Sequence, residues 1–252
     1  MSSADSVLRV EGIVKRFGGV HALRGVDLEI RAGERRAVLG PNGAGKTTLF
    51  GVISGSEFPT AGTIELLGQS VTNLPEANRA RLGLARTFQT SRVFSGLTVL
   101  ENLYLGALGV SLGHHSPIKT RNDGRLRDGA ERTAGRVGLG DRLRVAAADL
   151  SHGEQRQLEL GLALVADPRL LMLDEPAAGL SRAERQLLTQ LLLSLGREVT
   201  LILIEHDMDV ALTVAEHVTI MHEGRVVMEG SPAETRASKL VRDLYLGGVR
   251  AA

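Results

Sequence analysis

The stretch of sequence that decides the fold is residues 40–47, which read Gly40-Pro41-Asn42-Gly43-Ala44-Gly45-Lys46-Thr47. It matches the pattern Gly-x-x-x-x-Gly-Lys-Ser/Thr and follows the short apolar run 36–40, as a phosphate-binding loop between a strand and a helix requires. Glycine is needed because the backbone N–H groups must turn inward, in conformations that other residues resist. The pattern therefore predicts a strand, a phosphate-binding loop and a helix in that order.

Within this loop, the charge of Lys46 is expected to outweigh the other attractions for phosphate. A helix N-terminus carries about half a positive charge, worth roughly 0.3–1 kcal/mol at an exposed site. A pair of unit charges 4 Å apart is worth on the order of 4 kcal/mol at an effective dielectric constant of 20. Thr47 offers a hydroxyl to Mg²⁺, and Thr48 is placed to contact the α-phosphate of a nucleotide.

The composition is that of a compact chain with no general affinity for polyanions. The 252 residues are 43% hydrophobic with a formal net charge of +1, so no overall field attracts nucleic acid. Aromatic residues make up 3% and tryptophan is absent, which argues against base-stacking platforms. The lack of cysteine excludes disulfides and thiolate metal sites. No apolar run approaches the roughly 20 residues that span a bilayer, so we expect any membrane connection to come through a partner.

Short apolar runs alternate with helical patterns along the chain, which predicts an α/β fold with a mainly parallel sheet. The runs expected to be buried strands are 36–40, 170–174 and 200–204. The N-terminal runs are separated by glycine turns and predict an antiparallel β patch; they are 7–17, 26–30 and 63–67. We therefore expect a P-loop core of parallel strands accompanied by a smaller antiparallel sheet.

Helix starts and one hairpin are marked by local signals. A serine followed three residues later by a glutamate predicts a capping box, and this pattern occurs at Ser151/Glu154, Ser181/Glu184 and Ser231/Glu234, the last with Pro232 at the first helical position. The pair Glu223-Gly224 is a turn signal between the strand-like runs 218–222 and 225–229.

The middle of the chain has a different character. Gly, Arg and Ala dominate from about residue 101 to about residue 150, and residues 109–123 have the composition of a loop. We interpret residues 85–155 as a mainly helical subdomain inserted within a single domain of residues 1–252.

Two further sequences narrow the choice among P-loop proteins. Leu150-Ser151-His152-Gly153-Glu154 precedes a helical pattern, and Leu171-Met172-Leu173-Asp174-Glu175-Pro176 is an apolar strand that ends in two carboxylates. Here the chain resembles the ATP-binding-cassette (ABC) family, whose signature Leu-Ser-Gly-Gly-Gln stands shortly before its Walker B strand. By its motifs the resemblance extends from Phe17 to His206.

The resemblance assigns roles to these residues. It implies that Ser151 and the Gly153 amide face the γ-phosphate of an ATP held by the P-loop of a second cassette. A helix start is an anion site, so a capping box and a phosphate contact are compatible there. Asp174 would hold Mg²⁺, Glu175 would orient or deprotonate the attacking water, and His206 would contact the γ-phosphate.

Other positions match the family's pattern less completely. Gln89 matches the glutamine that senses Mg²⁺ and the attacking water, and Phe17 matches the aromatic that stacks on adenine, although a core phenylalanine is the alternative. His152, Glu154 and Ser181 depart from the commonest family residues. No role is therefore carried over to those three positions.

Within the family, the chain is similar to ATPase subunits of branched-chain amino-acid importers. The similarity lies in Arg86-Thr87-Phe88-Gln89, in residues 94–103, in residues 154–160 and in the terminal Leu244-Tyr245-Leu246-Gly247. Importers of urea and short amides share much of this pattern. The resemblance implies three kinds of partner: a second cassette, identical or different, transmembrane permease subunits, and indirectly a solute-binding protein. It also implies a location at the cytoplasmic face of the cell membrane.

Two alternatives remain open at this point. One is an ABC ATPase that acts on DNA or ribosomes, although such chains usually carry two cassettes or a long coiled-coil insertion. The other is a nucleotide-binding regulator without turnover, which the presence of Glu175 and His206 disfavours.

The segment 90–102 contains mixed apolar and basic residues in a stretch too short to bury them all. The side chains of Arg92, Val93, Phe94 and Leu97 either pack under the helical subdomain or line a groove for a permease helix.

Overall fold

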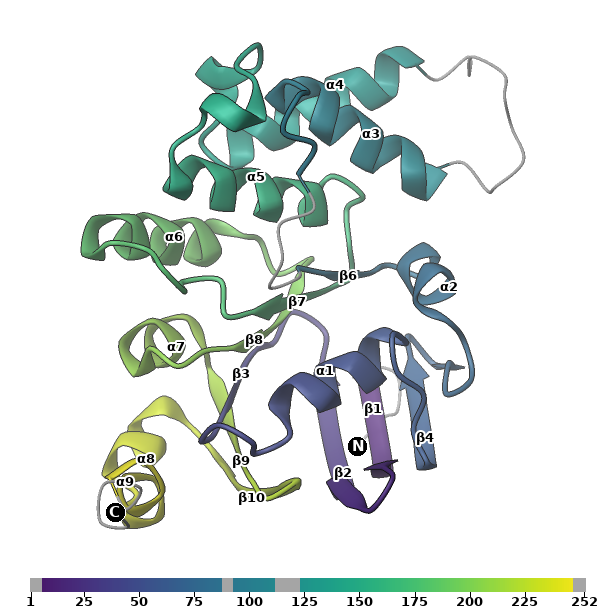
Figure 1. Cartoon of the computed structure of the whole chain (residues 1–252), viewed down its shortest axis with the longest axis vertical. Coiled ribbons are helices and arrows are strands. Elements are labelled where there is room, and N and C mark those ends of the chain that lie inside the picture. The colour runs from purple at the N-terminus through teal and green to yellow at the C-terminus, as the bar shows by residue number, and fades with distance from the viewer. Residues whose placement is uncertain (1–5, 88–92, 112–122, 247–252) are drawn as a thin grey trace.

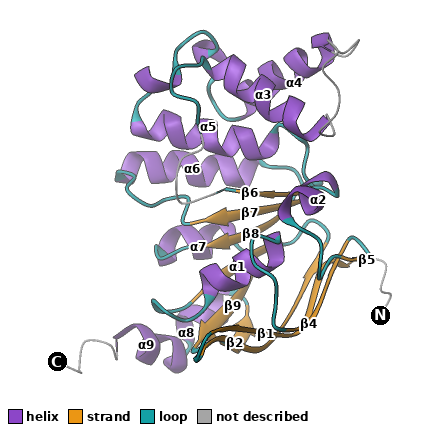
Figure 2. Cartoon of the chain, turned by 45° about the vertical axis from the view of Figure 1, so that its right-hand side comes forward, coloured by secondary structure: helices purple, strands orange, loops and turns teal. Residues whose placement is uncertain are grey.

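The computed structural model describes residues 6–87, 93–111 and 123–246, which form two β-sheets surrounded by helices (Figures 1 and 2). The larger sheet has six strands in the order β10-β9-β3-β8-β7-β6. All neighbouring pairs in it are parallel except β9 and β10. Its strands are β3 (Arg35–Leu39), β6 (Leu84–Arg86), β7 (Leu170–Asp174), β8 (Thr200–Ile204), β9 (His217–His222) and β10 (Arg225–Gly230). The mainly parallel sheet predicted from the alternating pattern is thereby confirmed.

The smaller sheet is antiparallel, as its glycine-spaced strands predicted. Its order is β2-β1-β4-β5. The strands are β1 (Ser6–Phe17), β2 (Val20–Arg31), β4 (Ala61–Leu66) and β5 (Gln69–Ser70). Helix α1 (Lys46–Ser54) lies between the two sheets, so the P-loop opens where both sheets meet (Figure 2).

The strands β7 and β8 are buried on both faces, and their alternate residues enter two different hydrophobic cores. Because successive side chains of a strand point to opposite faces, Met172 and Ile202 pack with α1 and the antiparallel sheet. Leu173 and Leu203 pack instead with the helices on the other face. This two-sided burial holds the carboxyl ends of both strands firmly beside the P-loop.

The helices that follow β6 lie on the side of the second face of the sheet, and the first two of them pack on the next α-helix rather than on the strands (Figure 1). They are α3 (Val99–Ser111), α4 (Asp123–Arg136), two 3₁₀ turns (Gly140–Arg142 and Ala147–Asp149), α5 (His152–Leu164), α6 (Arg182–Ser194) and α7 (Met208–Val214). The chain ends in α8 (Pro232–Ala237) and α9 (Lys239–Leu246). In the part of the chain that the structure describes, no helix combines the length and the apolar character needed to cross a bilayer.

Local signals predicted several helix starts correctly. All three serine–glutamate capping boxes form, at the starts of α5, α6 and α8. The prediction of a loop over residues 109–123 is wrong at both ends, because α3 continues to Ser111 and α4 begins at Asp123. Leu103 and Ala107 of α3 are buried against the other helices, and this packing stabilises the helix although its sequence is rich in glycine.

No local pattern predicted the fully buried side chain of Arg79, which lies in α2 (Glu76–Arg81). Its nitrogens donate to the carbonyls of Val52 and Ile53 at 2.8 and 2.6 Å, and to those of Leu74 and Thr72 at 2.9 and 3.1 Å. Burial lowers the pKa of Arg79 to about 10, so it stays charged at neutral pH. A cation at the last carbonyls of α1 favours the helix that begins in the P-loop.

Replacing Arg79 by methionine is expected to lower the free energy of unfolding by about 2–3 kcal/mol. The substitution fills similar space but leaves buried carbonyls of α1 and of the β5–α2 connection without their donor. Urea denaturation at equilibrium measures the effect. The control Arg81→Met, at an exposed position of the same helix, should stay within about 0.5 kcal/mol of wild type; an equal loss in both variants would contradict the role of Arg79.

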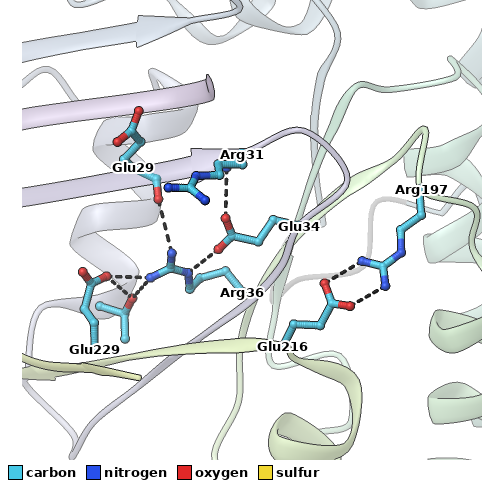
Figure 3. Close-up of polar contacts among 8 residues, drawn as sticks. Glu29, Arg31, Glu34, Arg36, Arg197, Glu216 and Glu229 are labelled. Atoms are coloured by element: carbon cyan, nitrogen blue, oxygen red, sulfur yellow. Dashed lines mark hydrogen bonds and ion pairs between the residues drawn. The ribbon is translucent and has the colours of Figure 1, made fainter. Parts of the chain in front are cut away.

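A second buried arginine anchors the strand that leads into the P-loop (Figure 3). Arg36 in β3 pairs with Glu34 and Glu229, each at 2.6 Å, and donates to Thr219 Oγ1 at 3.0 Å. It also contacts the carbonyl of Glu29 in β2 at 3.3 Å. Nearby, Arg197 and Glu216 form a two-pronged ion pair. The Arg36 cluster joins β2, β3, β9 and β10 at the end of β3 opposite the P-loop and so fixes the direction in which the strand enters the loop.

Candidate functional site

Residues 40–47 form a tight turn between β3 and α1, as their pattern predicted. Gly45 adopts a left-handed conformation with φ of 100° at the start of α1. A Cβ at this position would lie 2.7 Å from the Ala22 carbonyl oxygen, so the site accepts only glycine without displacement of β2. Gly224, in the β9–β10 turn, donates its N–H to the Ala44 carbonyl at 2.9 Å and fastens the loop from the other side.

A cavity of 590 Å³ lies in front of the loop and the α1 N-terminus. Residues predicted from the sequence form much of its wall: Asn42, Gly43, Ala44, Gly45, Lys46, Thr47, Thr48, Glu175 and His206. The remaining wall comes from the β2 residues Val20, His21, Ala22 and Arg24 and from the turn Glu223-Gly224. The structure thus brings the carboxyl ends of β3, β7 and β8 to one hollow. Helix N-termini and inward-facing loop amides make such a hollow a site for anions.

Lys46 is folded back onto its own loop. Its Nζ donates to the carbonyls of Gly40 at 2.7 Å and Pro41 at 3.1 Å. Burial lowers the pKa of Lys46, while the carboxylates of Glu175 and Asp174 act in the opposite direction. The ammonium is therefore positioned at the loop by neutral carbonyls that a phosphate group would replace with a stronger, charged acceptor.

Glu175 and His206 meet at the edge of the cavity. His206 Nε2 and Glu175 Oε1 are 2.6 Å apart, although the residues follow different strands. Glu175 has a positive φ of 51°, a conformation that costs energy in a residue with a side chain, and its N–H donates to the Ile204 carbonyl at 2.9 Å. The strained backbone turns the carboxylate toward the imidazole, an arrangement suited to holding and deprotonating a water molecule.

Asp174 is buried at the end of β7, where its Oδ2 pairs with Arg86 at 3.1 Å. Burial raises the pKa of Asp174, and the Arg86 guanidinium opposes this shift. Among the described residues, Asp174 Oδ1 has no hydrogen-bond partner although it is buried. An unpaired, buried carboxylate oxygen fits Mg²⁺, which is typically held by one or two protein oxygens together with phosphates and water.

Ser151 and Gly153 do not line the P-loop cavity of their own chain. They begin α5, where Ser151 accepts from the Glu154 N–H and Glu154 accepts from the Ser151 N–H. A Cβ at Gly153 would lie 2.6 Å from Glu184 Oε1, so glycine lets the starts of α5 and α6 approach closely. Ser151 is exposed and Gly153 is partly exposed at this helix start, where Glu184 from the start of α6 lies against Gly153.

Two predicted site residues stand apart from this arrangement. Phe17 is 46% exposed at the end of β1, so the alternative of a core phenylalanine is wrong. Its ring does not line the cavity and instead lies 4.7 Å from Lys15 Nζ. Gln89 falls outside the described residues.

Sequence reasoning missed three polar residues that support the site. Arg86 lies in the motif of residues 86–89, where no role was predicted for it, yet it links Asp174 to Ser54 Oγ in α1. The buried carboxylate of Glu205 accepts from the N–H groups of Ala177 at 2.8 Å and His206 at 3.2 Å. Burial raises the pKa of Glu205. Tyr245, in the C-terminal helix, contacts Gly40 at 2.8 Å. Adjacency to a motif was the only signal for the first two.

Sequence comparison relates this chain to known ATP-binding proteins. The sequence pattern of the family described as ABC transporter matches residues 23–178. The chain is 38% identical to the high-affinity branched-chain amino acid transport ATP-binding protein LivG of Salmonella typhimurium, over 97% of this chain and 99% of that one. It is 36% identical to the corresponding protein BraF of Pseudomonas aeruginosa, over 96% and 98%.

Solved structures show the same fold. The crystal structure of an ATP-binding cassette of an ABC transporter in its ADP conformation superposes with a TM-score of 0.85 at 29% identity, covering 96% of this chain and 99% of that one. A structure from Clostridium perfringens described as cbiO1, part of an ABC transporter complex, has a TM-score of 0.82 at 29% identity and covers 97% of each chain. With a P-loop, a carboxylate–histidine pair at its cavity and likeness over nearly its whole length, this chain belongs to the ABC transporter family and is an ATP-binding ATPase of that family.

Proposed function

We propose that this ATPase powers the import of branched-chain amino acids or of a related small polar solute such as urea or a short amide. The observation that carries the ATPase part is the 2.6 Å contact between Glu175 and His206 at the wall of the P-loop cavity. The solute class rests on similarity over nearly the full length to LivG and BraF, whose names specify branched-chain amino acids.

In the proposed reaction, Lys46 leaves the carbonyls of Gly40 and Pro41 and pairs with the β- and γ-phosphates of ATP. The backbone N–H groups of residues 42–48 surround the phosphates, with Thr48 near the α-phosphate. Glu175 accepts a proton from the attacking water, and His206 holds the γ-phosphate. Phe17 would stack on adenine, since its 46% exposed ring is accessible to a ligand.

Mg²⁺ would neutralise charge that develops on the phosphates, and the residues proposed to hold it are Thr47, Asp174 and Gln89. Asp174 suits this role because burial deprives its Oδ1 of any hydrogen bond among the described residues. The ion pair with Arg86 holds the other oxygen and so orients the carboxylate.

The exposed start of α5 supports a second cassette as partner. Ser151 and Gly153 lie away from the P-loop cavity of their own chain, so they would contact ATP bound to the other cassette. We further propose that residues 1–252 form one domain with a helical subdomain at 85–155. This subdomain would meet permease subunits at the cytoplasmic face of the membrane, with the solute-binding protein contacted only indirectly.

Phosphate release by the purified chain with ATP, in the presence of Mg²⁺ and after chelation with EDTA, tests the catalytic part. Mg²⁺-dependent release is expected; ATP binding without release would favour a regulator. Co-expression with any permease and solute-binding-protein genes that lie beside this one, followed by uptake of labelled leucine or urea, tests transport. An active ATPase that supports no uptake and purifies without membrane proteins would favour the alternative of a non-transport ABC ATPase.

Phe94 offers a direct test of contact with a permease. Its side chain is 59% exposed, so it does not pack under the helices, while its neighbour Val93 is partly buried against the core. Asn102 accepts from the Phe94 N–H at 2.8 Å and donates to its carbonyl at 3.0 Å. The backbone is thereby held in place while the ring points outward, as a docking residue requires.

Phe94→Ala is expected to leave the basal ATPase rate and the melting temperature of the isolated chain near wild type while reducing transport in the assembled complex. A buried phenylalanine would instead lose about 3–5 kcal/mol of stability. Phe58→Ala is the matched control. Phe58 is likewise exposed, at 48%, but it lies in the connection between α1 and β4, outside the segment 90–102. Normal ATP-coupled uptake by Phe94→Ala would exclude the docking role.

A further inference from the structure

The C-terminal helix α9 reaches the start of the P-loop. Tyr245 Oη accepts a hydrogen bond from the Gly40 N–H at 2.8 Å, although the two residues are 205 positions apart. Burial raises the pKa of Tyr245, while the Gly40 N–H acts in the opposite direction, so the phenol is neutral at physiological pH. The terminal motif around Tyr245 has no part in the proposed reaction, and this contact is what it adds to the site.

Gly40 is enclosed tightly enough for this contact to matter. It follows the last residue of β3 with a φ of 152°, and a Cβ there would lie only 2.1 Å from the Met221 carbonyl oxygen. Its carbonyl oxygen accepts from Lys46 Nζ at 2.7 Å. The two peptide groups that flank Gly40 are therefore each held by a side chain, one by Tyr245 and the other by Lys46.

These two contacts do not persist equally when phosphate binds. Lys46 has to release the carbonyls of Gly40 and Pro41 to pair with a nucleotide phosphate. The Tyr245 contact involves no atom that faces the nucleotide cavity and can be kept. Tyr245 then becomes the side chain that holds the first residue of the loop.

We propose that Tyr245 is a positioning residue for the P-loop, which holds the Gly40 amide while Lys46 moves from the loop carbonyls to the phosphates of ATP. The inference rests on the proposed role of Lys46. Without the phenol oxygen, the ligand-free loop can relax and expose the Gly40 N–H to water. The loop closed around phosphate cannot relax in this way, so the loss falls mainly on the nucleotide-bound state.

Tyr245→Phe removes this single oxygen and keeps the ring. We expect the dissociation constant for MgATP, measured by calorimetry, to rise about tenfold, because a buried amide loses its acceptor. The melting temperature without nucleotide should change little. The chain has only two tyrosines, so Tyr104→Phe in α3 is the matched control and should bind MgATP like wild type.

Hydrogen exchange at the Gly40 amide gives a second measurement. Without nucleotide, exchange at Gly40 should be faster in Tyr245→Phe than in wild type and unchanged in Tyr104→Phe. Wild-type MgATP affinity in Tyr245→Phe, with or without a lower melting temperature, would overturn the inference and leave α9 a merely structural element. Parallel measurement of Lys46→Ala separates the two ideas: wild-type affinity there overturns the role of Lys46, whereas lost binding there with intact binding in Tyr245→Phe overturns only the role of Tyr245.

Discussion

Lys46→Ala is expected to abolish tight binding of ATP. The ammonium is the one buried cation in the described wall of the cavity, and it is already poised within 3.1 Å of two loop carbonyls. Its attraction for phosphate is on the order of 4 kcal/mol at an effective dielectric constant of 20, which corresponds to roughly a thousandfold in affinity. The loop amides and the helix N-terminus contribute too little to replace it. Equilibrium binding of labelled ATP measures the loss.

The matched control for this variant is Lys239→Ala. It removes the same charge from an exposed position at the start of α9. Long-range effects of net charge would weaken both variants alike, whereas a direct contact with phosphate affects only Lys46→Ala. Near wild-type affinity in Lys46→Ala would refute the proposed role.

Glu175→Gln is expected to bind ATP but to hydrolyse it about 10²–10⁴ times more slowly. The amide keeps the shape of the side chain but cannot accept the proton of the attacking water. A slowing of about 10²–10⁴ is the usual effect of losing a general base. Its neighbour His206 stays in place, because the turn that carries it is held by the buried Glu205. Single-turnover phosphate release with saturating MgATP separates this chemical step from binding.

The same variant should also accumulate as a dimer. ATP that persists between two cassettes stabilises their association by mass action, which size-exclusion chromatography with MgATP detects. Glu223→Gln is the control, because Glu223 lines the same cavity from the β9–β10 turn and has no proposed role in the chemistry. Unchanged turnover in Glu175→Gln would exclude Glu175 as the base; slow turnover without dimer formation would indicate that a different cassette is the natural partner.

Features that depend on neighbouring residues were predictable. The P-loop at residues 40–47, the three capping boxes and the hairpin at Glu223-Gly224 each depend on contacts within a few positions. The strands 170–174 and 200–204 were predicted to the residue because burial on both faces leaves an uninterrupted apolar run. The family resemblance gave Glu175 and His206 separate roles at the attacking water and the γ-phosphate. The two side chains meet because the carboxyl ends of neighbouring parallel strands lie at one edge of a sheet.

Local patterns failed where packing decides the outcome. Arg79 looks like a surface residue in the sequence, yet it is buried because carbonyls of α1 and of the β5–α2 connection converge on its guanidinium. The end of α3 was misjudged for the same reason, since its stability comes from neighbouring helices rather than from its glycine-rich sequence.

The sequence by itself therefore determined the family, the position of the P-loop and the residues proposed for hydrolysis, because these depend on short motifs with strict spacing. Only the tertiary structure decided which distant polar groups hold those motifs in place. Tyr245 meets Gly40, and Glu205 joins the ends of β7 and β8, through pairings that exist only once the sheet has ordered its strands. The physical reason is that a hydrogen bond acts over about 3 Å in space whatever the separation along the chain, and only folding sets which groups come that close.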